Sequence, residues 1–196
     1  MKALLSQHQK QTPSSRHRER APTVTSSPLT PKSTTLVSAA GEYFVLSRLC
    51  LGGFIAALAP KGVPNTDIVV TDINGTRLFA IQVKARLEKG TDKGWHMNVK
   101  HERIVSDLLF YCFVDFGDGV TSIPTTFVVP SAVVAAALAK THRSWLTRPG
   151  KGGRAHRDTD LRRLVPDYSV YLGSDCGEYG GGWLECYREA WKLLSP

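Results

Sequence analysis

The stretch DIVVTDINGTRLFAIQV, residues 67 to 83, restricts the fold more than any other part of the chain. Two apolar runs flank the dipeptide Asn74-Gly75, which is the strongest short-range signal for a β-hairpin. The sequence therefore predicts two antiparallel strands in this stretch.

Side-chain alternation along the second strand creates two different faces. One face carries Phe79, Ile81 and Val83, whereas the other ends in Gln82 and Lys84, where a core strand would carry apolar residues. The start of the first strand faces the end of the second strand in a hairpin. We therefore expect Asp67 to lie near Gln82 and Lys84.

The rest of the sequence alternates helical and strand patterns. We expect a mostly buried helix that has Ser38 as its N-cap and ends before Pro60. Further expected elements are strands at 95–99, 107–116 and 125–130, a helix at 131–146, a weak strand around 168–172 and a closing amphipathic helix at 183–194. This order predicts an α/β fold with a central mixed β-sheet flanked by helices.

Composition and charge suggest how the chain is organised. A chain of 196 residues that is 42% hydrophobic can bury a sizeable core, and we predict a single domain over residues 36–196. Residues 1–35 hold six Lys or Arg against one Glu and very few large apolar residues, so we predict a disordered basic tail.

A second basic segment, the basic excursion at residues 140–163, holds eight Lys or Arg against two Asp. Clustered basic residues suit a polyanionic partner such as DNA, although a solvated surface is the commoner explanation of such runs. Trp145 in this segment could stack on a base, or pack the end of its helix. The predicted DNA-binding residues are Arg143, Arg148, Lys151, Arg154 and Arg157.

The cysteines, the apolar stretches and the histidines bear on the cellular compartment and on the possibility of a zinc site. Four scattered cysteines without a CxxC pair argue against a disulfide framework or a zinc ribbon, and no signal peptide is evident. The longest apolar stretch, 43–59, is too short for a membrane span and contains Arg48. His96 and His101 lack a third ligand for zinc. We predict a cytoplasmic protein without a membrane partner.

The residues around the hairpin point to a chemistry. Asp67 and Gln82 offer hard oxygen ligands suited to a Mg²⁺-like ion. Lys84 could orient or deprotonate an attacking water, or stabilise charge on a phosphoryl group. Singly, Asp67 could cap a turn, Lys84 could be an exposed strand-end lysine, and Glu42 on the preceding helix could interact with the helix dipole. Their order and spacing together favour a site.

This pattern resembles the PD-(D/E)XK nuclease superfamily, which includes many restriction enzymes and the archaeal Holliday-junction resolvases. Its members carry an Asp at the start of one strand, an acidic-x-Lys triplet on the next strand and often a Glu on the preceding helix. Asp67, Lys84 and Glu42 match these positions, and the resemblance covers roughly residues 38–130. The segments GEYFVLSRL, DLLFYCFVDF and YREAWKLL also look like bacterial members of the superfamily.

Two departures from the family pattern stand in this sequence. Pro64 is separated from Asp67 by two residues, and Gln82 occupies the position of the second acidic residue. An amide oxygen still coordinates a metal, but it brings no charge.

The resemblance implies a restriction-endonuclease-like fold and a DNA endonuclease that hydrolyses phosphodiester bonds with Mg²⁺ or Mn²⁺. It implies that Asp67, Gln82 and the Val83 carbonyl hold the metal, and that Glu42, Asp67, Gln82 and Lys84 form the catalytic set. Many enzymes of this family act as dimers, so a homodimer is also suggested. The alternative is a nuclease-fold module that binds nucleic acid without cleaving it.

Overall fold

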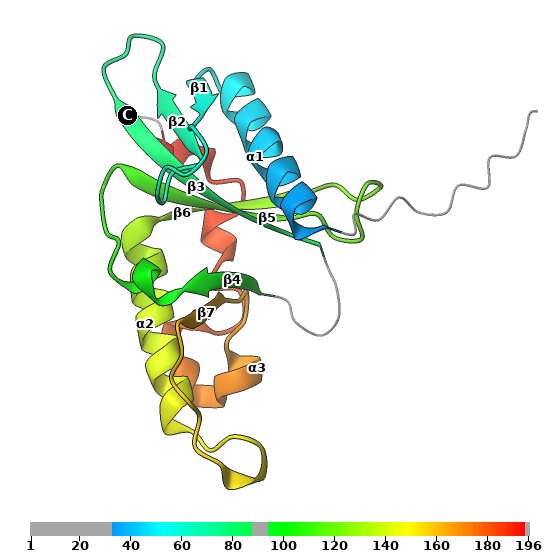
Figure 1. Ribbon diagram of the computed structural model, residues 1–196, viewed down its shortest axis with the longest axis vertical. Coiled ribbons are helices and arrows are strands. Elements are labelled where there is room, and N and C mark those ends of the chain that lie inside the picture. The colour runs from blue at the N-terminus through cyan, green and yellow to red at the C-terminus, as the bar shows by residue number, and fades with distance from the viewer. Residues whose placement is uncertain (1–32, 88–93, 195–196) are drawn as a thin grey trace, which may run out of the picture.

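The computed structural model describes residues 33–87 and 94–194. Its centre is a five-stranded mixed sheet in the order β1-β2-β3-β5-β6, in which β3 and β5 are parallel and the other neighbours are antiparallel (Figure 1). The strands are β1 (Ile55–Leu58), β2 (Ile68–Thr71), β3 (Leu78–Arg86), β5 (Leu109–Asp115) and β6 (Thr125–Pro130). The predicted α/β class with a central mixed sheet is confirmed.

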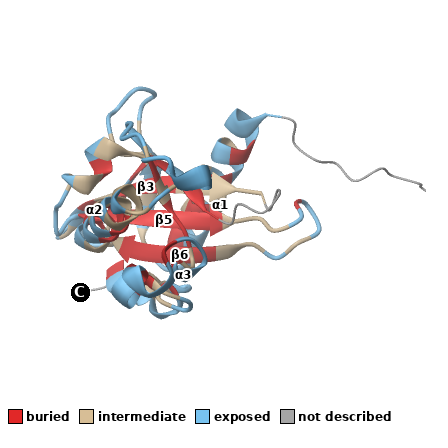
Figure 2. Ribbon diagram, turned by 90° about the horizontal axis from the view of Figure 1, so that it is seen from below, coloured by how far each residue is buried: buried red, intermediate tan, exposed pale blue. Residues whose placement is uncertain are grey.

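One helix covers each face of the sheet. On α1 (Thr34–Leu51), Val45 and Leu49 pack against the face that carries Phe79, Ile81 and Val83. On α2 (Ser131–Thr147), Val134 and Leu138 pack against the opposite face, which carries Tyr111 and Phe113. Buried residues are concentrated along β3, β5 and β6 between these two layers (Figure 2).

The predicted hairpin forms with the expected sidedness. Ile68 pairs with Ile81 and Val70 with Phe79, and all four side chains are buried in the core under α1. Gln82 and Lys84 therefore lie on the other face, since successive side chains alternate. The predictions of strands at 107–116 and 125–130, and of a helix from Ser131, are also confirmed.

The predicted strand at 95–99 forms outside the central sheet. It is β4 (Trp95–Asn98), which pairs antiparallel with β7 (Leu161–Leu164) in a separate two-stranded sheet. A short 3₁₀ helix, η1 (Val99–Glu102), follows β4 directly, and Asn98 Oδ1 accepts a hydrogen bond from the Lys100 N–H at 3.0 Å. This segment lies on the α2 side of the sheet.

The first helix differs from its prediction at both ends. It starts at Thr34 with Ser33 as N-cap, not Ser38, because the Ser33 hydroxyl accepts the Thr35 N–H. Structure therefore begins inside the stretch assigned to the tail, while residues 1–32 lie outside the described part. The helix ends at Gly52, and residues 55–58 form β1, whose pairing occupies the outer edge of β2. A short apolar run such as IAAL fits a helix or a strand equally well.

The weak strand expected at 168–172 is wrong. Residues Ser169–Leu172 form the short helix α3, and the strand of this region is β7, at residues that the sequence assigned to the basic excursion. Its sequence LRRL alternates so that Arg162 is buried, at 5% exposure. The strand could not be predicted from LRRL, because an arginine is buried only when it has partners, and these partners lie elsewhere in the chain.

The closing amphipathic helix is also wrong, since residues 183–194 form short 3₁₀ turns, η4 (Glu185–Tyr187) and η5 (Trp191–Leu194). Leu184 packs in the core under α2, whereas Leu194 packs in the core under α1. A straight helix of this length could not reach both faces. The chain breaks at Glu189, which has a φ of 47° and accepts the Thr126 N–H at 2.9 Å.

Gly41 sets how closely α1 approaches β3. A Cβ at this position would lie 2.5 Å from the Ala85 Cβ and 3.3 Å from Val83. We expect Gly41→Ala to destabilise the protein by about 1–3 kcal/mol through overpacking, although Gly to Ala in an unhindered helix stabilises by about 1 kcal/mol. Urea unfolding measures the difference. Ser38→Ala, at an exposed position of the same helix, should stay within about 0.5 kcal/mol of wild type. A gain in stability for Gly41→Ala would contradict this packing.

Candidate active site

Asp67 lies immediately before β2, at the point where β3 extends beyond its antiparallel partner. Its N–H donates to the Ile81 carbonyl at 2.9 Å, which continues the ladder by one bond. Its carboxylate Oδ2 accepts the Val83 N–H at 2.7 Å and a hydrogen bond from the Gln82 amide nitrogen. The structure thus brings Asp67 and Gln82 together, as the hairpin geometry predicted.

The Val83 backbone faces the same place. In an extended strand the N–H and C=O groups of one residue point to the same side, and the Val83 N–H points to Asp67. The Val83 carbonyl is therefore presented on the Asp67 side of β3. Its apolar side chain packs in the core under α1.

Lys84 is half-buried on the face that it shares with Gln82. Burial lowers the pKa of its ammonium group, the charge of Asp67 opposes this shift, and the charge of Lys100 adds to it. Lys84 therefore lies within electrostatic reach of both Asp67 and Lys100. An ammonium group in a partly desolvated position next to a carboxylate can bind an anion or exchange a proton more readily than a surface lysine.

Glu42 approaches the site from α1. It follows Gly41, the residue at which the helix lies against β3. Partial burial raises the pKa of the Glu42 carboxyl, the charge of Asp67 raises it further, and Lys61 opposes the shift. The two carboxylates of the site are thus close enough to repel each other, and a cation between them would relieve this repulsion.

The donor set fits a hard divalent cation. Asp67 supplies a carboxylate, Val83 a backbone carbonyl and Gln82 an amide oxygen, and oxygen ligands of this kind suit Mg²⁺. Gln82 now turns its amide nitrogen to Asp67, so the amide group must rotate to present its oxygen. Among residues 33–87 and 94–194, no three His, Cys, Asp or Glu side chains cluster as a metal site would require. A cation here would have Asp67, the Gln82 amide oxygen and the Val83 carbonyl as its ligands.

Sequence reasoning missed three residues that border this site: Lys100, His101 and Tyr111. His101 is 3% exposed, and its Nδ1 lies 2.7 Å from the Tyr111 hydroxyl. Burial and the charges of Lys84 and Lys100 lower the pKa of His101 to about 4, so its ring is neutral at pH 7. The only signal in the sequence is the pair His96 and His101, which lacks a third ligand for zinc.

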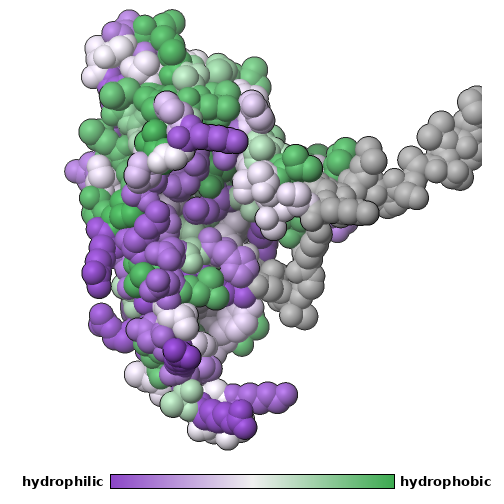
Figure 3. Space-filling model, in the orientation of Figure 1, coloured by the Kyte–Doolittle hydropathy of each residue, from purple (hydrophilic) through white to green (hydrophobic). Residues whose placement is uncertain are grey.

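The basic excursion forms the end of α2 and the loop that leads to β7. Figure 3 shows hydrophilic side chains gathered over this lower part of the molecule. Arg148 is engaged within the protein, because it donates to the Leu172 carbonyl and forms an ion pair with Asp175 at 2.8 Å. The other four predicted DNA contacts are exposed: Arg143, Lys151, Arg154 and Arg157.

Trp145 packs the end of its helix, which is the second of the two roles considered for it. Its ring stacks on His156 at a centroid distance of 3.8 Å and on His142 at 5.3 Å. It also lines a cavity of about 320 Å³ between α2, β7 and α3. Asp67, Gln82 and Lys84 are not among the residues that line this cavity.

No family model matches the sequence, and no curated protein matches it. Among solved structures, the fold is similar to the bacterial homing endonuclease I-Ssp6803I, with 19% identity, a TM-score of 0.45, and coverage of 83% of this chain and 91% of that chain. It is also similar to Hjc, a Holliday junction resolvase of the archaeal hyperthermophile Archaeoglobus fulgidus. This second match has 18% identity, a TM-score of 0.37, and coverage of 68% of this chain and 86% of that chain.

Likeness at this level says nothing about activity, which must be argued from the residues of the site. The described part of the chain also contains no helix that is long and apolar enough to span a membrane.

The neutrality of Gln82 leads to a prediction about metal affinity. Gln82→Glu adds a carboxylate beside Asp67, so we expect Mg²⁺ and Mn²⁺ to bind more tightly. Without metal, the two carboxylates repel and the variant should melt at a lower temperature than wild type. Calorimetric titration and thermal unfolding with metal or chelator measure both effects. Gln82→Met removes the donor and should weaken binding. Equal metal affinity in all three proteins would show that residue 82 is not a ligand.

Proposed function

We propose that this protein is a metal-dependent DNA endonuclease that hydrolyses phosphodiester bonds. The observation that carries the proposal is the hydrogen-bonded pair of Asp67 and Gln82 at the open edge of β3, with Lys84 on the same strand face. The resemblance of this motif to the PD-(D/E)XK superfamily supports it.

The proposed roles follow from the chemistry of each group. Asp67, the Val83 carbonyl and the Gln82 amide oxygen would hold Mg²⁺ or Mn²⁺, with Glu42 close enough to assist through an intervening water. When bound, the ion would polarise the phosphodiester and lower the pKa of an attacking water. Lys84 orients this water or stabilises the negative charge that develops on the phosphoryl group.

DNA binding is assigned to exposed basic residues remote from the hairpin in sequence. Arg143, Lys151, Arg154 and Arg157 are exposed and would contact phosphates, and the basic residues of 1–32 would add to the attraction. Arg148 could join them only by exchanging its ion pair with Asp175 for a phosphate. Phosphate contacts of this kind position the protein on DNA without reading its sequence.

A second candidate function is a module that binds nucleic acid without cleaving it. The observation that favours it is Gln82, which satisfies Asp67 with an N–H donor instead of adding a second negative charge. In this alternative, Lys84 and the basic loop bind phosphates and no hydrolysis follows.

One experiment separates the two functions. The purified protein is incubated with supercoiled plasmid, linear duplex, single-stranded DNA and a four-way junction, each with Mg²⁺, Mn²⁺ or chelator. The endonuclease is expected to cut at least one substrate with either metal and none with chelator. Failure to cut any substrate, together with retained binding to the same DNA, would overturn the proposed function in favour of the binding module.

A further inference from the structure

Lys100 lies next to the candidate active site through a chain of contacts that begins in the sheet. In the parallel register of β3 and β5, Gln82 pairs with Tyr111 and Lys84 pairs with Phe113. Paired residues of neighbouring strands project to the same face. The Tyr111 ring therefore lies beside Gln82, and it is fully buried.

Tyr111 holds η1 against the face of the sheet that carries Gln82 and Lys84. Its hydroxyl lies 2.7 Å from the His101 Nδ1, and the two rings meet edge to face with centroids 5.5 Å apart. Both side chains are buried, so the contact is fixed and shielded from water. It places η1, and hence Lys100, across the polar end of β3.

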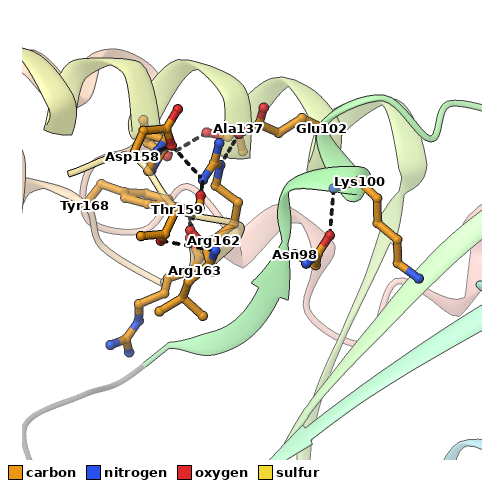
Figure 4. A network of polar contacts seen from close by, with 12 residues as sticks. Asn98, Lys100, Glu102, Ala137, Asp158, Thr159, Arg162, Arg163 and Tyr168 are labelled. Carbon is orange, nitrogen blue, oxygen red and sulfur yellow. Dashed lines mark hydrogen bonds and ion pairs between the residues drawn. The ribbon is translucent and has the colours of Figure 1, made fainter.

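Arg162 of β7 also holds η1 in place, through Glu102. Its guanidinium donates to Glu102 and to the carbonyls of Thr159 and Leu161, the latter at 3.0 Å, and it is 5% exposed. Figure 4 shows that the Lys100 side chain extends away from this network. Lys100 is exposed, and no described carboxylate forms an ion pair with it. The segment therefore holds an uncompensated ammonium group on a rigid support.

The positive charges of Lys84 and Lys100 would favour a bound anion. Lys84 and Lys100 repel each other, and both disfavour a charge on His101. Two ammonium groups near one another, on the side where Asp67 lies, are a suitable environment for a phosphodiester, which brings charge and acceptor oxygens.

We propose that Lys100 binds a backbone phosphate of the DNA substrate next to the bond that is cleaved, and so shares the substrate with Lys84. This inference rests on the proposed function for the identity of the site. It adds a residue that the superfamily motif does not contain. It also assigns a role to Arg162, which positions the segment that carries Lys100 and does not itself contact the substrate.

The test measures binding separately from cleavage. Binding of a fluorescein-labelled DNA duplex is measured in chelator over a range of salt concentrations for wild type and for Lys100→Ala, Lys100→Arg and Lys192→Ala. Lys192 is an exposed lysine on η5 and serves as the matched control. We expect Lys100→Ala to weaken binding and to reduce the salt slope by about one unit. Lys100→Arg should restore the slope, and Lys192→Ala should match wild type.

A double-mutant cycle of Lys84 and Lys100 tests whether the phosphate bound by Lys100 lies next to the candidate active site. If Lys84 and Lys100 share one segment of DNA backbone, the losses of kcat/KM in Lys84→Ala and Lys100→Ala should not add in the double variant. With metal, Lys100→Ala should also lower kcat/KM for cleavage. Equal melting temperatures of the variants confirm that they are folded.

The outcomes separate this inference from the proposed function. A wild type that cleaves DNA, with Lys100→Ala equal to Lys192→Ala in salt slope and kcat/KM, would overturn the inference alone. Strictly additive losses in the double variant would also overturn it, because the two lysines would then engage the DNA independently of each other. A wild type that binds DNA but never cleaves it would overturn the proposed function. In that case a smaller salt slope for Lys100→Ala than for wild type would still support the phosphate contact.

Discussion

Asp67→Asn is expected to abolish metal-dependent cleavage while the protein stays folded. Asn keeps the shape of Asp67, and its amide oxygen can still accept the Val83 N–H that now lies 2.7 Å from Oδ2. It removes the carboxylate that is hydrogen-bonded to Gln82 and Val83 of β3. Loss of the cation forfeits several kcal/mol of transition-state stabilisation, which corresponds to a fall in rate of about 10³-fold or more. Single-turnover cleavage measures the effect.

The control for this variant is Asp118→Asn, which removes the same charge from an exposed loop. It should cleave like wild type. Affinity for DNA, measured in chelator, should be equal or higher in Asp67→Asn, because one negative charge no longer faces the phosphates. If the wild type cleaves DNA, unchanged cleavage by Asp67→Asn would refute the proposed site.

Lys84→Met is expected to lower the cleavage rate by about 10²- to 10⁴-fold with little change in DNA affinity. Met retains the apolar stem that the half-buried lysine packs against its neighbours and removes only the ammonium group. A group that acts mainly in the transition state affects kcat and kcat/KM alike. Rates and affinities are measured side by side with Mg²⁺, Mn²⁺ and chelator.

The alternative function makes the opposite prediction for Lys84. A binding module would show no cleavage in any form, and Lys84→Met would lose the affinity of one phosphate contact, with a smaller salt slope. Lys192→Met, on an exposed turn, should match wild type in both assays. Full cleavage by Lys84→Met would show that the lysine has no part in the chemistry.

The site was predictable from sequence where its contacts are local. Asp67 and Gln82 are only 15 residues apart and joined by a tight turn, so the hairpin brings them together whatever surrounds it. Side-chain alternation then placed Gln82 and Lys84 on one face. Lys100 and His101 could not be predicted in the same way. Their position depends on a register between β3 and β5 and on the contact of His101 with Tyr111.

The two wrong predictions of secondary structure, at β7 and at the closing helix, share one physical cause. β7 was missed because the buried Arg162 pairs with Glu102, 60 residues earlier in the chain. The closing helix was wrong because Glu189 is held by the Thr126 N–H, 63 residues earlier, and because the segment contacts both cores. Local propensity cannot register such partners, and tertiary packing routinely overrides it.

The sequence by itself determined the hairpin, the sidedness of β3 and the meeting of Asp67 with Gln82, because a short connection between the strands and a period of two leave few alternatives. Only the tertiary structure decided that IAAL becomes β1, that LRRL becomes β7, and that Lys100 joins the site. Each of these outcomes depends on hydrogen bonds or burial supplied by segments distant in sequence, whose positions are set when the layers pack.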